Sequence, residues 1–432
     1  MDCPRLLVLT DIGGDPDDQQ SLVRLLLYSN EFQIEGLIAS ASGTPGELRE
    51  AVTRADLIRT TVEAYEQVQP NLVKHATGYP AAKDLLACIK SGNPRRGLEV
   101  IGEGHDTEGS RWIIARADAG EARPLNITVW GGQTDLAQAL WRVRHDRSPT
   151  ELKAFLAKLR VYDIDDQDRI QPWIFENFPD LFYVLAKSQP TRDKREGAYR
   201  GMYLGGDESL TSLAWLDEHV RSGHGPLGAL YPAKTWTAPN PHGALKEGDT
   251  PSWFYFLPLA VQDPAHPDWG GWGGRFRRAE RGLWRDVADS VGGKPDPRAS
   301  VWRWRPFYQR DFQARLDWCA KDTKGANHPP ALSIDGASVV RPLERRMAAG
   351  KPIMLQADAK DSDGDSLRYS WWIYDDAGSY AGAVKLSNEA ASAVTVMIPQ
   401  DAGSKTLHLI VEATDNGMPP LTALARIMLT VD

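Results

Sequence analysis

Cysteine is scarce in this sequence, which has only Cys3, Cys88 and Cys319. Their odd number and wide spacing argue against a disulfide framework and against a thiolate zinc cluster. Basic residues are not in excess, because 50 Lys and Arg face 58 Asp and Glu, for a net charge of -8. A nucleic-acid polymer is therefore not expected as a partner, since phosphate binding needs clustered cations. No run of about 18 apolar residues occurs, so no membrane span is predicted.

The N-terminal residues leave no room for a secretion signal, because a predicted strand begins at Arg5. We expect either a cytoplasmic protein or one from which a signal peptide has been removed.

The bulk composition is that of a globular protein, with 42% hydrophobic and 25% charged residues. A length of 432 residues suggests two or three domains. Tryptophan is frequent, at 15 residues. Most of these must serve packing, but a few could line a sugar-binding cleft, because flat aromatic faces suit the apolar faces of sugar rings.

The first part of the chain alternates between strand and helix patterns. Apolar runs predict strands at 5–10, 32–41, 125–130 and 160–164, and helical patterns follow at 20–28, 47–68, 134–143 and 170–185. This alternation predicts an α/β fold with a mainly parallel sheet and flanking helices. Ligands bind beyond the carboxyl ends of such strands, where the sequence places the polar segments 11–18, 133–135 and 163–168.

The character of the chain changes around the polar segment 321–330, which ends in two prolines and indicates a linker. Beyond it, short alternating runs at 352–357, 367–374, 393–398, 406–412 and 423–431 predict an antiparallel, Ig-like β-sandwich. We therefore expect an α/β domain over 1–326 and an all-β sandwich over 327–432.

The loop after the first predicted strand holds four carboxylates within eight residues, Asp11, Asp15, Asp17 and Asp18. Such crowding is costly unless a cation neutralises it, and Ca²⁺ prefers oxygen ligands of this kind. Capping of the next helix could explain some of these residues, but hardly the aspartate on the strand side. The loop therefore predicts a calcium site.

Two further segments have both a functional and a structural interpretation. The segment 163–168 closes a strand, so Asp166 and Asp168 could contact substrate or donate a proton, or could form a solvated acidic loop. In the segment Trp269-Gly-Gly-Trp-Gly-Gly-Arg275, Trp272 could face a sugar, although burial of the indoles explains the pattern at least as well.

The acidic loop resembles the Asp-x-Asp-Pro-Gly-x-Asp-Asp signature of inosine–uridine nucleoside hydrolases, with Gly13 in place of the second aspartate. Gly131-Gly-Gln-Thr-Asp-Leu-Ala137 is similar to a segment of that family whose threonine gives a backbone carbonyl to calcium. Asp249 stands where the family has its last metal carboxylate. The resemblance implies a calcium site formed by Asp11, Asp18, Thr134 and Asp249.

The whole chain resembles bacterial secreted proteins described as cellulose-binding, which join a nucleoside-hydrolase-like domain to an Ig-like domain. The residues that carry this resemblance are Thr10-Asp-Ile-Gly-Gly-Asp-Pro-Asp-Asp18, Val129-Trp-Gly-Gly132, Asp249-Thr-Pro-Ser252, Trp269 to Arg275 and Asp361-Ser-Asp-Gly-Asp365. It implies a carbohydrate partner and a secreted or periplasmic location, and it leaves a homo-oligomer open.

The chemistry implied is hydrolysis at a sugar centre, with a loop aspartate as base. Since Gly13 cannot serve, Asp11 is the first candidate and Asp15 the reserve, while Asp17 is expected to bind a sugar hydroxyl. The family's histidine before the last metal carboxylate is replaced by Gly248, which makes release of a nucleobase less expected than cleavage of an O-glycoside.

Three functions follow from this pattern. The first is a calcium-dependent glycoside hydrolase that acts on a furanosyl or related sugar. The second, which Gly13 and Gly248 favour, is a carbohydrate-binding or cellulose-binding protein without turnover. The third is a nucleoside N-ribohydrolase.

Overall fold

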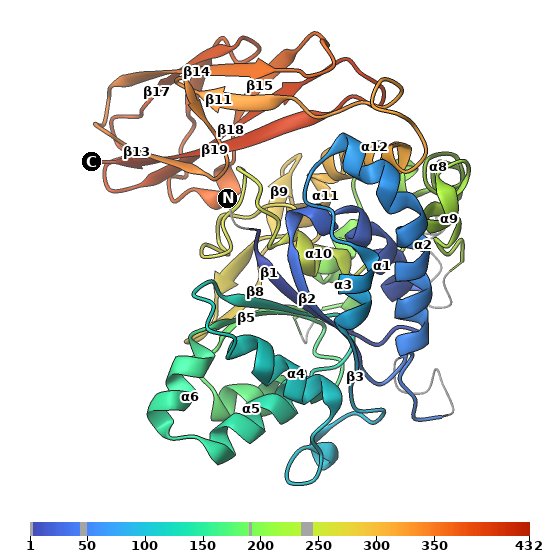
Figure 1. Ribbon diagram of the computed structural model, residues 1–432. Helices are drawn as coiled ribbons and strands as arrows, with labels where there is room; N and C mark the ends of the chain where they lie inside the picture. Colours follow the sequence, from blue (N-terminus) through green and yellow to red (C-terminus); the bar gives the residue numbers. More distant parts are fainter. Residues whose placement is uncertain (1–2, 44–49, 190–191, 235–244) are drawn as a thin grey trace.

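The computed structural model describes residues 3–43, 50–189, 192–234 and 245–432. Its N-terminal part is an α/β domain, and its C-terminal part is a β-sandwich packed on one end of that domain (Figure 1). The predicted fold class is confirmed. Within the described residues, no helix is both long and apolar enough to cross a membrane.

An eight-stranded sheet forms the centre of the α/β domain, in the order β3-β2-β1-β4-β5-β6-β8-β7. All neighbouring strands are parallel except β7 and β8. The strands are β1 (Arg5–Thr10), β2 (Gln33–Ala39), β3 (Ile89–Ser91), β4 (Leu125–Val129), β5 (Leu159–Ile164), β6 (Phe182–Ala186), β7 (Phe276–Arg278) and β8 (Leu283–Asp286). The central strands are buried on both faces, which explains their continuous apolar runs.

Helices cover both faces of the sheet (Figure 1). Side chains of α1 (Asp17–Leu27), α2 (Ala55–His75), α10 (Thr250–Phe254) and α12 (Arg305–Trp318) share one hydrophobic core with Leu6 and Val8 of β1. Side chains of α4 (Glu108–Ala117), α5 (Thr134–Asp146), α6 (Pro149–Leu156) and α7 (Gln171–Asn177) share the opposite core with Leu7 and Leu9. Besides several 3₁₀ turns, the shorter elements are α3 (Ala82–Ala87), α8 (Leu213–Leu216), α9 (Gly225–Ala229), α11 (Ala299–Trp302) and the hairpin of β9 (Asp289–Val291) and β10 (Lys294–Asp296).

The predicted helix over 170–185 is wrong in its second half. Helix α7 ends at Asn177, and residues Phe182–Ala186 form strand β6 of the central sheet. Pro179 and Asp180 separate the two elements, and the uninterrupted apolar run after them suits a buried strand. The long helix expected over 47–68 begins at Ala55 as α2, and positions 47–49 lie outside the described residues.

The C-terminal part consists of two packed sheets with strand orders β12-β11-β14-β17-β16 and β13-β19-β18-β15. Their strands are β11 (Ala331–Ile334), β12 (Ala337–Ser338), β13 (Leu343–Met347), β14 (Pro352–Lys360), β15 (Arg368–Ile373), β16 (Lys385–Ser387), β17 (Ala393–Met397), β18 (Thr406–Thr414) and β19 (Thr422–Val431). The inner faces of the two sheets share a separate hydrophobic core. The proposed boundary between 326 and 327 falls between α12 and β11.

The two parts meet at a polar interface centred on Asp289, which is fully buried. Its carboxylate accepts hydrogen bonds from Arg275 (2.6 Å) and Arg303 (2.6 Å) of the α/β domain. The hydroxyl of Tyr374, from the sandwich, donates a third bond to it (2.5 Å). A buried charge with three donors is well compensated, so these residues fix the docking of the sandwich.

The glycine-rich segment around Trp269 belongs to the same interface. The guanidinium of Arg426, in β19, donates to the carbonyl of Gly270 (3.1 Å), and Trp269 packs edge-on against His408 with ring centroids 5.5 Å apart. Trp272 is only 5% exposed and packs in the core against Phe254. The structure therefore assigns this segment to packing, and it does not bring Trp272 to a surface where a sugar could contact it.

Candidate functional site

A cavity of about 910 Å³ opens beyond the carboxyl ends of β1, β5 and β6. Its wall carries charges of both signs. The acidic side chains are Asp11, Asp15, Asp17, Asp18, Asp165, Asp166, Asp168 and Asp249, and the basic ones are Arg96, Arg169, Lys187, Arg192, Lys194, Arg200 and Lys246. The parallel sheet brings these residues together because its strand ends meet at one edge.

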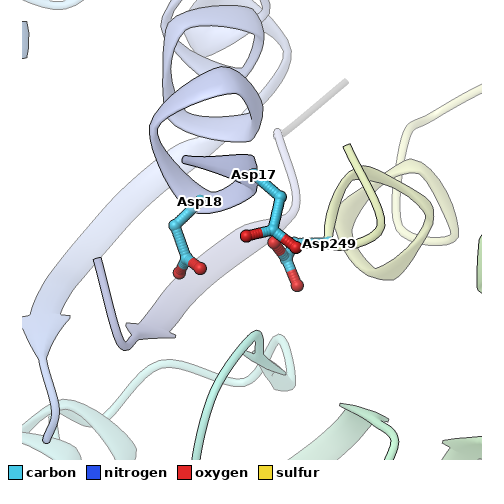
Figure 2. A group of neighbouring side chains, drawn as sticks. All are labelled: Asp17, Asp18 and Asp249. Atoms are coloured by element: carbon cyan, nitrogen blue, oxygen red, sulfur yellow. The ribbon is translucent and has the colours of Figure 1, made fainter. Parts of the chain in front are cut away.

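Three carboxylates converge on one point of this cavity. Asp17 and Asp18 begin α1, and Asp249 comes directly before α10. One oxygen from each lies within 4.8 Å of the others, and Figure 2 shows the three side chains directed toward a common space. The Thr10 hydroxyl donates a hydrogen bond to Asp18, whereas Oδ2 of Asp249 is buried without any partner among the described residues.

Burial and mutual repulsion disfavour three ionised carboxylates at this point. Burial raises the pKa of Asp17 to about 7 against the attraction of Lys246. Burial also raises the pKa of Asp18 and of Asp249, and neighbouring aspartates add to both shifts. An oxygen-only donor set with an unpartnered buried oxygen fits a hard cation such as Ca²⁺.

Asp11, one of the four implied calcium ligands, is bound by an arginine in the structure. Nη2 of Arg96 lies 2.7 Å from Oδ2 of Asp11, and Nη1 of the same residue lies 3.0 Å from Oδ1 of Asp168. The three-carboxylate group contains two of the implied ligands, Asp18 and Asp249, together with Asp17 and not Asp11. Asp11 still lines the cavity beside this group.

Two glycines after β4 make room for these carboxylates. A Cβ atom on Gly131 would lie 2.3 Å from Cγ of Asp11, and one on Gly132 would lie 2.1 Å from Oδ2 of Asp168. Thr134 follows them at the start of α5, and both its hydroxyl (2.6 Å) and its backbone N–H (3.0 Å) donate to Asp168. The Thr134 hydroxyl also accepts from the N–H of Gly97 (3.1 Å), so its side chain contacts Asp168 and Gly97, while calcium binding by its backbone carbonyl stays a prediction.

Asp15 has a cationic partner of its own. The ammonium group of Lys246 forms an ion pair with Asp15 and lies 3.9 Å from Oδ2 of Asp17. The backbone N–H of Lys246 donates to Oε1 of Gln20 (2.8 Å), which fixes the lysine against α1.

Gly13 cannot be replaced by the aspartate of the nucleoside hydrolases in this backbone. Its φ of +110° is unfavourable for other residues, and a Cβ atom there would lie 2.4 Å from Oγ of Ser42. The Ser42 hydroxyl donates to the carbonyl of Ile12 (2.6 Å), which fixes this close approach.

Tyr199 fills the space next to Gly248, the position of the family's histidine. A Cβ atom on Gly248 would lie 3.2 Å from the Tyr199 ring. Tyr199 belongs to the 3₁₀ helix Ala198–Met202 and is buried, and the guanidinium of Arg200 lies 4.9 Å from its ring centroid. His242, which precedes Asp249 by seven residues in the chain, lies outside the described residues.

The aspartates after β5 have different surroundings. Asp163 is buried and accepts from Gln133 (2.9 Å), and burial raises its pKa well above the ordinary value. Asp166 pairs with Lys187 (3.1 Å). Asp165 lines the cavity, and its backbone has a positive φ of 68°. It has no ion pair within 4.0 Å among the described residues. Burial raises the pKa of Asp165.

Sequence reasoning missed Arg96, Lys246 and Tyr199 as members of the site. Arg96 lies 85 residues from Asp11 in the chain, and Lys246 lies 231 residues from Asp15. No local pattern marks such isolated residues. The only available signal was that the many acidic side chains expected at this edge of the sheet require cations nearby.

Two family descriptions match the chain on either side of the linker. Residues 5–276 match "Cellulose-binding Sde182, nucleoside hydrolase-like domain". Residues 352–431 match "Cellulose-binding protein Sde0182, C-terminal domain". No curated protein matches the chain.

Solved structures include one that is similar over the full length. It is a nucleoside hydrolase-related hypothetical protein from Saccharophagus degradans, described as associated with carbohydrate metabolism. It is 34% identical, each chain covers 100% of the other, and the TM-score is 0.83. Human CDH23 EC21-23 is 20% identical over 26% of this chain and 35% of its own, with a TM-score of 0.19. The first of the two families matches more than half of this chain. The chain therefore belongs to the nucleoside-hydrolase-like family described as cellulose-binding Sde182.

Proposed function

We propose that this protein is a calcium-dependent glycoside hydrolase that acts on a furanosyl or related sugar. The observation that carries the proposal is the group of Asp17, Asp18 and Asp249, with its unpartnered buried oxygen, on the wall of a large cavity. A fourth carboxylate, Asp11, lines the same cavity and is available for proton transfer.

Calcium would be held by Asp17, Asp18 and Asp249, and when bound it would neutralise their charge and act as a Lewis acid on oxygen atoms of the substrate. These proposed ligands differ from the set expected from the sequence, which was Asp11, Asp18, Thr134 and Asp249. Asp17 becomes a ligand, and Asp11 becomes the base alone.

Asp11 is positioned for its role by Arg96 and Gly131. The bond from Arg96 fixes one carboxylate oxygen, and the absence of a side chain on Gly131 lets the carboxylate approach the end of β4. In the reaction, Asp11 takes a proton from the attacking water as that oxygen bonds to the anomeric carbon. Asp15, paired with Lys246, is the reserve candidate.

Asp165 is our candidate for the proton donor to the leaving oxygen as the glycosidic C–O bond breaks. Its burial favours the protonated form at neutral pH more than for an ordinary aspartate, which is what a general acid requires. Asp166 and Asp168 line the same cavity and remain candidates for contacts with substrate hydroxyls.

Carbohydrate binding without turnover is the second candidate. The packing of Tyr199 beside Gly248 favours it, because this ring occupies the space next to the position of a family acid. The description of both matched families as cellulose-binding also supports a carbohydrate partner, and with it a site of action outside the cytoplasm.

Hydrolysis of a panel of aryl furanosides, aryl pyranosides, nucleosides and cello-oligosaccharides tests the proposal. The protein is first freed of metal with EDTA and then assayed with and without added calcium. Calcium-dependent release of aryl alcohol from a furanoside is the expected result. Binding of cello-oligosaccharide with no turnover of any substrate would instead establish the second candidate, and calcium-independent turnover would overturn the metal role.

A further inference from the structure

The side of the cavity formed after β5 and β6 is rich in basic side chains. Lys187 and Lys194 follow β6, Arg200 lies in the 3₁₀ helix Ala198–Met202, and Arg169 ends the loop after β5. All four line the cavity. Since β6 is the third strand from β1 in the sheet, this basic side lies on the order of 14 Å along the sheet from β1, where the acidic loop begins.

Only part of this positive charge is neutralised by described residues. Lys187 pairs with Asp166 (3.1 Å). Asp165 interacts electrostatically with Arg200, Lys187 and Lys194, but no ion pair within 4.0 Å links it to any of them among the described residues. Arg169 and Lys194 have no side-chain hydrogen bond or ion pair within the described part of the chain. Asp168, the third carboxylate of this loop, is paired with Arg96, so these four cations face two carboxylates.

Arg200 lines the cavity, and the protein satisfies only part of its guanidinium. Its Nη1 donates to the Tyr203 hydroxyl (2.5 Å), but its Nε is buried without a hydrogen-bond partner among the described residues. Because the guanidinium lines the cavity, its remaining donor capacity can serve a ligand there, and an oxyanion is the acceptor that a guanidinium binds most strongly.

We propose that the sugar bound in this cavity carries an anionic substituent, a carboxylate or an ester sulfate, on the β5–β6 side. Arg169, Lys194 and Arg200 bind this group, and the Tyr199 ring contacts the sugar beside it. The inference rests on the proposed function only in that a sugar occupies the cavity, and it does not require turnover.

Binding of matched sugar pairs tests the inference. The first pair is methyl glucuronide and methyl glucoside, and the second is galactose 6-sulfate and galactose. Dissociation constants are measured by calorimetry or ligand-observed NMR on the full chain with calcium present. We expect the anionic member of at least one pair to bind roughly 10-fold or more tightly, and this preference to fall at high salt. A preference in one pair alone identifies the substituent.

The double variant Arg169→Gln/Lys194→Gln removes two exposed cations and is expected to reduce the preference to less than about 3-fold at an unchanged melting temperature. The control is Arg277→Gln/Arg278→Gln, which removes the same charge from exposed positions on β7 outside the cavity and should leave the preference intact. Equal affinity within both pairs, failure of all four sugars to bind, or equal loss in both double variants would overturn the inference. A preference for the anion in a protein that hydrolyses nothing would refute the hydrolase and leave the inference standing.

Discussion

A Cβ atom on Gly248 would lie 3.2 Å from the ring of Tyr199, so the two positions share one space. The ring of Tyr199 therefore occupies space that the side chain of a histidine at position 248 would need. We expect Gly248→His alone to destabilise the fold by about 1–3 kcal/mol, because the ring must move in a packed region. The combination with Tyr199→Ala should recover part of that loss. Thermal unfolding of both variants checks this, and equal stability of Gly248→His and the parent would contradict it.

Gly13 should tolerate no side chain. Gly13→Ala combines an unfavourable φ of +110° with a Cβ 2.4 Å from Ser42, and we expect a loss of about 2–4 kcal/mol in the free energy of unfolding. Gly104→Ala is the matched control, because Gly104 also has a positive φ, of +80°, but no atom within 4 Å of its Cβ position. It should cost only about 1 kcal/mol. Equal losses would show that backbone strain alone restricts position 13.

Asp249→Asn should weaken calcium binding on the order of 100-fold, because it removes the carboxylate whose Oδ2 has no other partner. Calorimetric titration of metal-free protein with calcium measures this. Asp358→Asn removes the same charge at an exposed position on β14 and should have no effect. Equal affinities in the two variants would rule out the proposed metal site.

Asp11→Asn should reduce turnover by roughly 100-fold or more, the scale of a positioned general base, while calcium binding changes little. The reason is that Asp11 lies outside the group of Asp17, Asp18 and Asp249. Asp18→Ala should abolish both. If Asp11→Asn instead lost calcium as Asp18→Ala does, Asp11 would be a ligand, and Asp15 would become the candidate base.

Asp286 should give the fold a measurable pH dependence. Burial raises the pKa of Asp286 from 3.8 to about 8. Between those two pH values the folded chain holds a proton that the unfolded chain has released, so this residue lowers the free energy of unfolding as pH rises. The variant Asp286→Asn cannot titrate at this position, so its free energy of unfolding lacks this dependence on pH. Its stability relative to the parent should therefore rise by about 1–3 kcal/mol from pH 5 to pH 7 in urea unfolding with EDTA. Parallel curves would mean that Asp286 is ionised throughout.

The sequence predicted the parts of the site that are continuous in the chain. The apolar run before Asp11 placed the acidic loop at the end of a buried strand, and the family motif placed Asp249 beside Asp18. The pairing of Asp11 with Arg96, on which the proposed exchange of roles between Asp11 and Asp17 rests, could not be predicted, because Arg96 reaches Asp11 across the ends of neighbouring strands. Strand β6 was not predicted either, because a short apolar run that follows a helix has no periodicity that distinguishes a new strand from a continuation of the helix.

Asp289 constrains how a protein of this kind can evolve. Its hydrogen-bond donors come from both domains, so replacing the sandwich by another would leave a buried carboxylate short of the bond from Tyr374. Such a loss costs on the order of 1–3 kcal/mol unless the incoming domain brings its own hydroxyl. The two domains are therefore expected to be inherited as a pair, and a substitution on one face of the interface to be followed by a compensating one on the other.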